Sequence, residues 1–257
     1  WRSVFVVGGV APLILAVLLV FLLPESIRHM VARRADPARI RAVMRRIAPE
    51  AATIDSFTLP EAASLQGEGA QVVLSRELRL GTFMLWIAYF MGLVIFYALI
   101  NWLPLLLKEA QIAPRAATLI TSLFALGGFG ALVSGWLMDR RDADWTVAAF
   151  YALTALSVAA IGLFLGSPAA LVAIVFLAGV AMNTAQTSLP SLAAAYYPTR
   201  GRGTGVAWML GVGRFGGIAG SLLVGWLAQM QLSLPTIFAV VSLAGLVAAA
   251  ARAVKRR

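Results

Sequence analysis

The sequence predicts an all-α membrane protein with seven transmembrane helices, arranged as one helix, a long basic loop and then six helices. Of the 257 residues, 61% are hydrophobic and only 12% are charged, whereas soluble chains are about 45–50% apolar and about 25% charged. The apolar residues stand in continuous runs, which excludes the alternating strands of a membrane β-barrel. The same composition excludes a disordered chain or a coiled coil.

Seven stretches are long enough, or nearly so, to cross a bilayer, which takes about 20 apolar residues in a helix. These stretches are residues 4–23, 82–107, 118–138, 146–165, 169–197, 204–230 and 235–251. Six of them carry no charge, and the sixth in order carries only Arg214. We therefore divide the chain into a first transmembrane helix at 1–23, a cytoplasmic loop at 24–80 and a six-helix unit at 81–257.

The distribution of basic residues predicts the orientation. If the spans alternate, one side of the membrane receives 17 of the 21 Lys and Arg residues, and the other side receives Arg2, Lys108 and Arg115. Basic loops stay in the cytoplasm, so the C-terminus is predicted to be cytoplasmic. The net charge of +10 is explained by these loops, and we predict no nucleic-acid partner.

The loop at 24–80 contains one predicted amphipathic helix. Asp36 and Pro37 offer an N-cap and a first helical residue, and the apolar residues then follow with helical spacing. They are Ile40, Val43, Met44 and Ile47, with Arg39, Arg41, Arg45 and Arg46 on the other faces. Such a basic helix either lies on anionic lipid headgroups or is a solvated connecting helix.

Arg214 is the main candidate for a functional residue. A permanent charge near the middle of a span costs about 3 kcal/mol or more unless it faces protein or water. Its guanidinium can bind a carboxylate through two hydrogen bonds. The functional interpretation is an anchor for an anionic substrate, and the alternative is an ion pair with a carboxylate on another helix. Gly213, Gly216, Gly217 and Gly220 around it have the spacing of close helix packing.

Two other spans carry polar residues that need partners in lipid. Asn183, Gln186 and Thr187 share one face of the fifth span, where Pro190 can break the helix. They either line a substrate cavity or bond neighbouring helices. In the second span, Tyr97 and Asn101 lie on one helix face with Tyr89 close by, so their side chains are candidates to line the same cavity.

A second candidate site lies at the predicted cytoplasmic ends of the helices. Asp139 ends the third span and Arg202 begins the sixth, and each charge opposes its helix dipole. With Arg140 they predict a charge latch that controls a cytoplasmic gate, although ordinary topology signals explain the arginines equally well. No metal-binding, nucleotide-binding or catalytic motif is present in the spans, so we predict no cofactor, no metal and no enzyme.

These motifs resemble the major facilitator superfamily. Pro24-Glu25-Ser26-x-Arg28 before a long basic loop is similar to the end of helix 6, and Gly135-x-Leu137-x-Asp139-Arg140 resembles the cytoplasmic signature between helices 8 and 9. Asp142-Ala143-Asp144 departs from that signature, which usually continues with glycine and basic residues. Tyr197-Pro198-Thr199 with Arg202, followed by Gly213-Arg214-x-Gly216, resembles helix 11 of the aromatic acid:H⁺ symporters, the carriers of benzoate, hydroxybenzoate and protocatechuate.

The resemblance covers the whole chain as helices 6–12 and implies a C-terminal transporter half. It implies functional importance for Asp139, Arg202 and Arg214. Because the chain opens on Trp1, we expect it to be a fragment whose N-terminal half is a further partner, beside the lipid bilayer of a bacterial inner membrane. The superfamily's acidic motif in helix 1 has no counterpart in these spans.

The predicted function is proton-coupled uptake of an aromatic carboxylate by alternating access. Arg214, Asn183, Gln186, Tyr89, Tyr97 and Asn101 are the predicted substrate ligands, and Asp139, Arg140 and Arg202 are the predicted gate. The partners are then a small organic anion and a proton. Alternatives are a carrier for a sugar acid, a dicarboxylate or an exported drug, or a seven-helix receptor or channel-like module.

Overall fold

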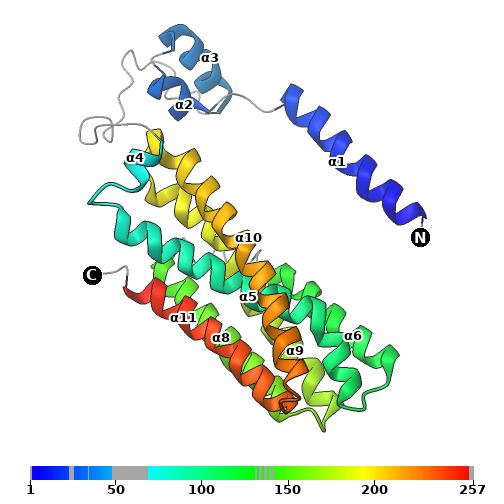
Figure 1. Ribbon diagram of the computed structural model, residues 1–257. Coiled ribbons are helices and arrows are strands. Elements are labelled where there is room, and N and C mark those ends of the chain that lie inside the picture. The colour runs from blue at the N-terminus through cyan, green and yellow to red at the C-terminus, as the bar shows by residue number, and fades with distance from the viewer. Residues whose placement is uncertain are drawn as a thin grey trace. The chain divides into compact units, whose positions relative to one another are not determined.

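The structure, a computed structural model, describes residues 2–22, 26–33, 35–47, 69–130 and 142–254, together with residues 132, 135, 138 and 140. Within these residues the secondary structure is helical and contains no β-strand (Figure 1). The predicted all-α membrane fold class is therefore confirmed. Residues 1–65 and 66–257 form separate compact units, which are described in turn.

The first unit contains α1 (Arg2–Leu22), α2 (Ile27–Ala32) and α3 (Pro37–Ile47). α1 coincides with the first predicted span, and its apolar part is Gly9–Leu22. α3 is the predicted amphipathic helix, and it begins as expected, because the Ala38 N–H donates to Asp36 Oδ1 at 2.9 Å. Met30 of α2 and Ile40 of α3 are both buried, which fits an apolar face turned away from water.

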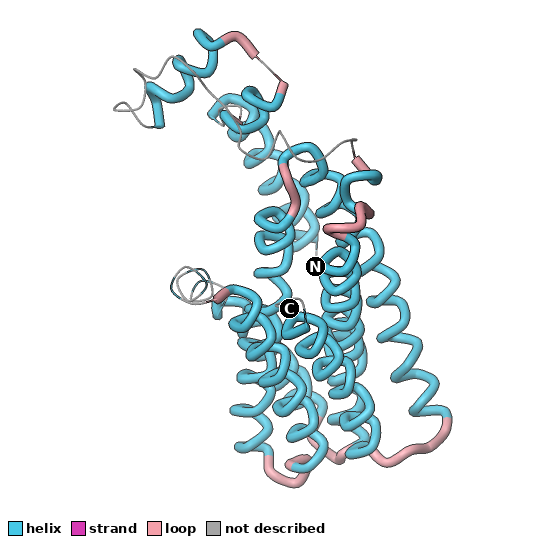
Figure 2. Tube along the Cα trace, turned by 90° about the vertical axis from the view of Figure 1, so that its left-hand side faces the viewer, coloured by secondary structure: helices cyan, strands magenta, loops and turns pink. Residues whose placement is uncertain are grey.

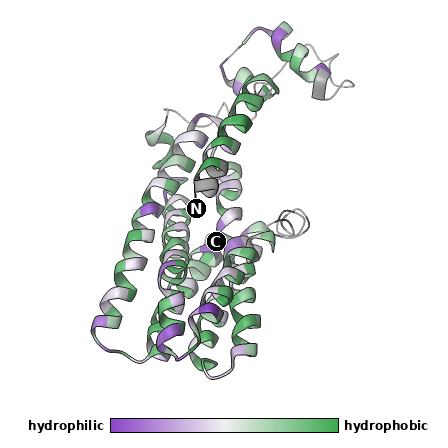
Figure 3. Cartoon of the chain, turned by 90° about the vertical axis from the view of Figure 1, so that its right-hand side faces the viewer, coloured by the Kyte–Doolittle hydropathy of each residue, from purple (hydrophilic) through white to green (hydrophobic). Residues whose placement is uncertain are grey.

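The second unit is a helical bundle, and its described residues include five helices that are long and apolar enough to cross a membrane. They are α5 (Arg79–Glu109), α8 (Ala143–Leu163), α9 (Pro168–Tyr196), α10 (Thr199–Gln229) and α11 (Leu234–Val254). Figure 2 shows the turns after α5, α8 and α10 at one end of the bundle. Figure 3 shows that the helices are mostly hydrophobic, as helices that face lipid must be.

The predicted third span, 118–138, differs from the others. It falls on α6 (Pro114–Leu126) and the 3-10 helix η3 (Gly127–Gly130), and then on positions that are mostly outside the described residues. The α-helix changes to a 3-10 helix where Gly127 packs directly on the backbone of Gly179 in α9. The total of seven spans therefore stays a prediction.

Two further details refine the sequence-based division. The short helix α4 (Ala70–Val73) lies inside the predicted loop but contacts α10, with Val72 against Gly201. The end of the loop is therefore part of the bundle unit. α9 continues through Pro190 without a break, so a broken helix at this proline is wrong. Packing against neighbouring helices allows membrane helices to accommodate proline.

Candidate functional site

The candidate site is centred on Arg214, the middle residue of α10. Fifteen residues separate it from each end of the helix, which is about 22 Å at 1.5 Å per residue. Its side chain is exposed, and no ion-pair partner is present among the described residues. The described part of the chain therefore contains no carboxylate paired with Arg214, which was the alternative interpretation of this residue.

The glycines around Arg214 bring α10 into direct contact with α5. Gly216 lies against the Phe90 carbonyl and Gly220 against the Val94 carbonyl, where a Cβ atom has no room. Gly213 and Gly217 lie against the rings of Tyr89 and Tyr97. The packing role expected of these glycines is confirmed, and it places two tyrosine rings beside the arginine.

A polar network extends from this point into the bundle. The Tyr89 ring of α5 lies against Gly213, the residue next to Arg214. Gln186 Nε2 donates to the Tyr89 backbone carbonyl at 3.4 Å, and the Tyr151 hydroxyl donates to Gln186 Oε1 at 2.8 Å. Gly92 leaves the space in which Gln186 and Tyr151 meet. Gln186 of α9 therefore bonds Tyr89 of α5, whose ring lies against Gly213 next to Arg214, and Tyr97 lies against Gly217 about one turn further along α10.

The other two predicted ligands bond between helices. Asn183 Nδ2 donates to the Phe124 carbonyl of α6 at 3.1 Å and to the Gly179 carbonyl at 2.8 Å. Asn101 Nδ2 donates to Ser221 Oγ at 2.8 Å and so connects α5 with α10. Both amides have helix partners in this arrangement, and their contact with a substrate stays a prediction.

The structure describes two of the three predicted gate residues. Asp139 lies outside the described residues, and Arg140 is at an exposed position. Arg202 Nη2 donates to the Tyr197 carbonyl at 3.3 Å, and its Nε atom is buried without a hydrogen-bond partner in the described part of the chain. The latch between these three residues stays a prediction.

The turn between α9 and α10 is connected to the start of α5. The Tyr197 hydroxyl donates to Thr82 Oγ1 at 3.2 Å, and Thr82 Oγ1 donates to the Val73 carbonyl at 2.8 Å. Burial raises the pKa of Tyr197, although its hydrogen bond with Thr82 acts in the opposite direction. The phenol therefore remains neutral near pH 7 and can keep donating this hydrogen bond.

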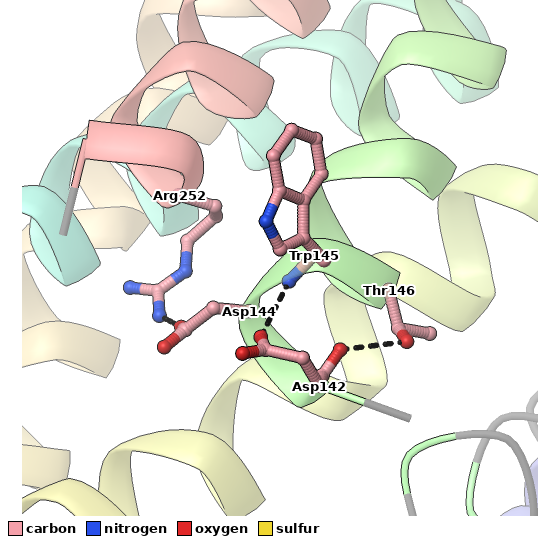
Figure 4. A network of polar contacts seen from close by, with 5 residues as sticks. All are labelled: Asp142, Asp144, Trp145, Thr146 and Arg252. Atoms are coloured by element: carbon pink, nitrogen blue, oxygen red, sulfur yellow. Dashed lines mark hydrogen bonds and ion pairs between the residues drawn. The ribbon is translucent and has the colours of Figure 1, made fainter. Parts of the chain in front are cut away.

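One ion pair at this end of the bundle was not expected from the sequence. Arg252, in the last turn of α11, pairs with Asp144 in the first turn of α8 (Figure 4). Asp142 caps α8, because its Oδ1 accepts the Trp145 N–H at 3.0 Å. The two acids that depart from the loop signature thus have defined roles, one as a helix cap and one as an ion-pair partner.

Long apolar helices that carry a charged residue and polar side chains near their middle are features of an integral membrane protein. The family model described as "Major Facilitator Superfamily" matches residues 85–257. The chain belongs to this superfamily.

Curated relatives agree with the aromatic acid symporter resemblance. The chain is 42% identical over 252 residues to a gallate transporter of Pseudomonas putida, which covers 98% of this chain and 56% of that protein. It is 43% identical over 237 residues to the 4-hydroxybenzoate transporter PcaK of Pseudomonas aeruginosa, covering 91% and 52%. It is 33% identical over 236 residues to a benzoate transport protein of Acinetobacter baylyi, covering 90% and 50%. The chain thus spans about half the length of these relatives, and the resemblance to this family is confirmed.

Sequence reasoning missed Tyr151 and the Asp144–Arg252 pair. Tyr151 is a single tyrosine in an otherwise apolar span, so only the position of Gln186 on the facing helix reveals its role. The signal for the ion pair was the acid at Asp144, in the first turn of α8. Its partner is more than 100 positions away in the chain, which no local pattern can connect.

Proposed function

We propose that the full protein takes up an aromatic carboxylate together with a proton by alternating access. The observation that carries this proposal is an exposed arginine at the middle of a membrane helix, beside two tyrosines. The Arg214 side chain is exposed, and α10 is the least buried of the five long helices in the described part of the chain. Lipid cannot solvate a guanidinium, whereas a water-filled cavity that admits an anion can.

In this proposal the guanidinium of Arg214 binds the substrate carboxylate through two hydrogen bonds. Tyr89 and Tyr97 contact the aromatic ring, because aromatic rings pack well edge to face or offset. Gln186 adds a hydrogen bond at the same depth. The relatives named above are transporters of gallate, 4-hydroxybenzoate and benzoate, which supports a substrate that combines a ring and a carboxylate.

The predicted spans of this chain contain no acidic residue. We therefore assign the proton-carrying group to a part of the protein outside these spans. Asp139, Arg140 and Arg202 form the cytoplasmic gate in this proposal. The C-terminus lies in the cytoplasm of a bacterium, and the protein resides in its inner membrane.

The test is uptake by liposomes that contain the protein expressed from its complete open reading frame. Labelled gallate, 4-hydroxybenzoate and benzoate are offered with an inward proton gradient. We expect accumulation that a protonophore abolishes and that Arg214→Leu reduces to background. Arg115→Leu, which removes an exposed arginine at the start of α6, is the matched control and should retain uptake. Absence of accumulation would favour a receptor, and normal uptake by Arg214→Leu would exclude the anchor role.

A further inference from the structure

The donors and acceptors of the hydrogen bonds beside Arg214 determine how the Gln186 amide is oriented. A tyrosine hydroxyl donates one hydrogen and accepts others, whereas a glutamine amide has a distinct donor end and acceptor end. The Tyr151 hydroxyl donates to Gln186 Oε1 at 2.8 Å. This bond fixes the amide with its oxygen toward α8 and its NH₂ group toward α5.

The NH₂ group of Gln186 then acts as a donor toward Tyr89. Gln186 Nε2 donates to the backbone carbonyl of Tyr89 at 3.4 Å. An amide nitrogen only donates, so this bond requires that the NH₂ group, and not the amide oxygen, faces α5. The bond restrains Tyr89, whose ring lies against Gly213, next to Arg214.

Tyr151 is well placed to hold this arrangement. Its side chain is 0% exposed, so the hydroxyl needs a partner inside the protein. Gly92 provides the space, since a Cβ atom at this position would overlap both Gln186 and the Tyr151 hydroxyl. The buried tyrosine, the amide and the glycine therefore form one fixed unit.

We propose that Tyr151 is a positioning residue that orients Gln186, which in turn holds Tyr89 in place beside the anion that Arg214 binds. This inference rests on the proposed function, because it assumes a carboxylate at Arg214. Tyr89 then contacts the aromatic ring of the substrate, while Arg214 binds its carboxylate. Tyr151 itself never touches the substrate and acts through Gln186 and Tyr89.

The test is the uptake kinetics of Tyr151→Phe, Gln186→Met and the double variant, with the protein expressed from its complete open reading frame and labelled 4-hydroxybenzoate as the probe. Loss of one neutral hydrogen bond predicts a KM about 3- to 10-fold higher for Tyr151→Phe, with the maximal rate per molecule within about twofold of wild type. The double variant should equal Gln186→Met alone, because Tyr151 acts only through that side chain. KM does not depend on how much protein reaches the membrane.

Thr154→Val is the matched control. Thr154 lies one turn further along α8, is fully buried and donates to the Phe150 carbonyl of its own helix, so its KM should not change. A wild-type KM in Tyr151→Phe, or independent multiplied effects in the double variant, would overturn the positioning role. If wild type accumulates 4-hydroxybenzoate and needs Arg214, such results contradict this inference alone. Failure of wild-type uptake contradicts the proposed function instead.

Discussion

Two arginines of the bundle, Arg214 in the middle and Arg252 at one end, differ in exposure and in partners. At the end, Arg252 is 0% exposed and is paired with Asp144. In the middle, Arg214 is exposed, with no ion-pair partner in the described part of the chain. A guanidinium in or near a membrane must be satisfied by protein, water or a ligand. Arg252 has an acidic partner within the fold, whereas Arg214 has none among the described residues.

The helix dipoles reinforce this contrast. Arg252 lies in the last turn of α11, and Asp144 lies in the first turn of α8. Both charges are therefore at the favourable ends of their helices. Arg214 is 15 residues from either end of α10, where the dipole has no effect. Arg252 thus has an acidic partner and a favourable helix end, and Arg214 has neither in the described part of the chain, so we expect a structural role for the first and a functional role for the second.

The largest expected effect tests the structural arginine. Arg252→Leu removes the ion pair with Asp144. Breaking a fully buried pair costs about 3–5 kcal/mol, and because the Asp144 side chain is 25% exposed, we expect a loss at or below the lower end of this range. We expect a lower unfolding temperature in detergent, followed by tryptophan fluorescence. Uptake per folded molecule should stay near wild type.

The double variant with Asp144→Leu is the control for Arg252→Leu. It replaces the pair by two apolar residues, which is often nearly neutral, so much of the lost stability should return. A stable Arg252→Leu protein without uptake would reverse the assignment and make this pair part of the transport mechanism.

Arg214→Leu should show the opposite pattern. Loss of two charge-assisted hydrogen bonds to a carboxylate corresponds to about a 100-fold lower uptake rate at low substrate concentration. The unfolding free energy should change by less than about 0.5 kcal/mol, because the exposed side chain has no partner to lose. Arg214→Lys keeps the charge but not the planar pair of donors, so it should retain partial uptake. Equal uptake by Lys and Leu variants would contradict the bidentate contact.

Gly216→Ala tests how the centre is assembled. The added Cβ meets the Phe90 carbonyl, and backbone atoms cannot move aside as a flexible side chain can. Overpacking of this kind costs about 1–3 kcal/mol, and we expect it to separate α10 from α5 and reduce uptake together with stability. Gly211→Ala, where nothing lies within 4 Å, is the control. Equal stability of the two variants would show that the helices do not depend on this contact.

The sequence was most informative about the helices and least about the pairs between them. Continuous apolar runs predicted α5, α8, α9, α10 and α11 to within a few residues, because lipid requires length and apolarity. The third predicted span was less regular, because the α-helix changes to a 3-10 helix at Gly127, where the backbone packs against α9. Such a contact depends on a residue about 50 positions away, which the local pattern does not contain.

The candidate site shows the same limit. A charge in an apolar span identified Arg214, and the spacing of aromatic and amide residues pointed to Tyr89, Tyr97 and Gln186. The sequence also pointed to Asn183 and Asn101, but it could not separate a substrate ligand from an interhelical bond, and their contact with a substrate stays a prediction. Their hydrogen bonds go to Phe124 and Ser221, and only the packing of the helices reveals these partners.

The smallest expected effect concerns the opposite end of the bundle, where α5 and α10 finish in the same way. After each helix a glutamine adopts a positive φ, 63° at Gln111 and 54° at Gln231. At the first, the Gln111 N–H donates to the Lys108 carbonyl at 3.0 Å and the Ile112 N–H to the Leu107 carbonyl at 3.1 Å. These two bonds form a Schellman motif, whose left-handed residue is usually glycine.

Gln111→Gly should therefore stabilise the protein by about 0.5–1 kcal/mol, because glycine adopts this conformation without steric cost. The measurement is the unfolding temperature, with Ala110→Gly as control. Ala110 has φ −73°, so glycine there should bring no gain. Uptake should not change in either variant, since Gln111 lies at a helix end, far in sequence from Arg214. A stabilised protein with altered uptake would show that the ends of the helices also contribute to transport, and the division between a structural end and a functional centre would then be too simple.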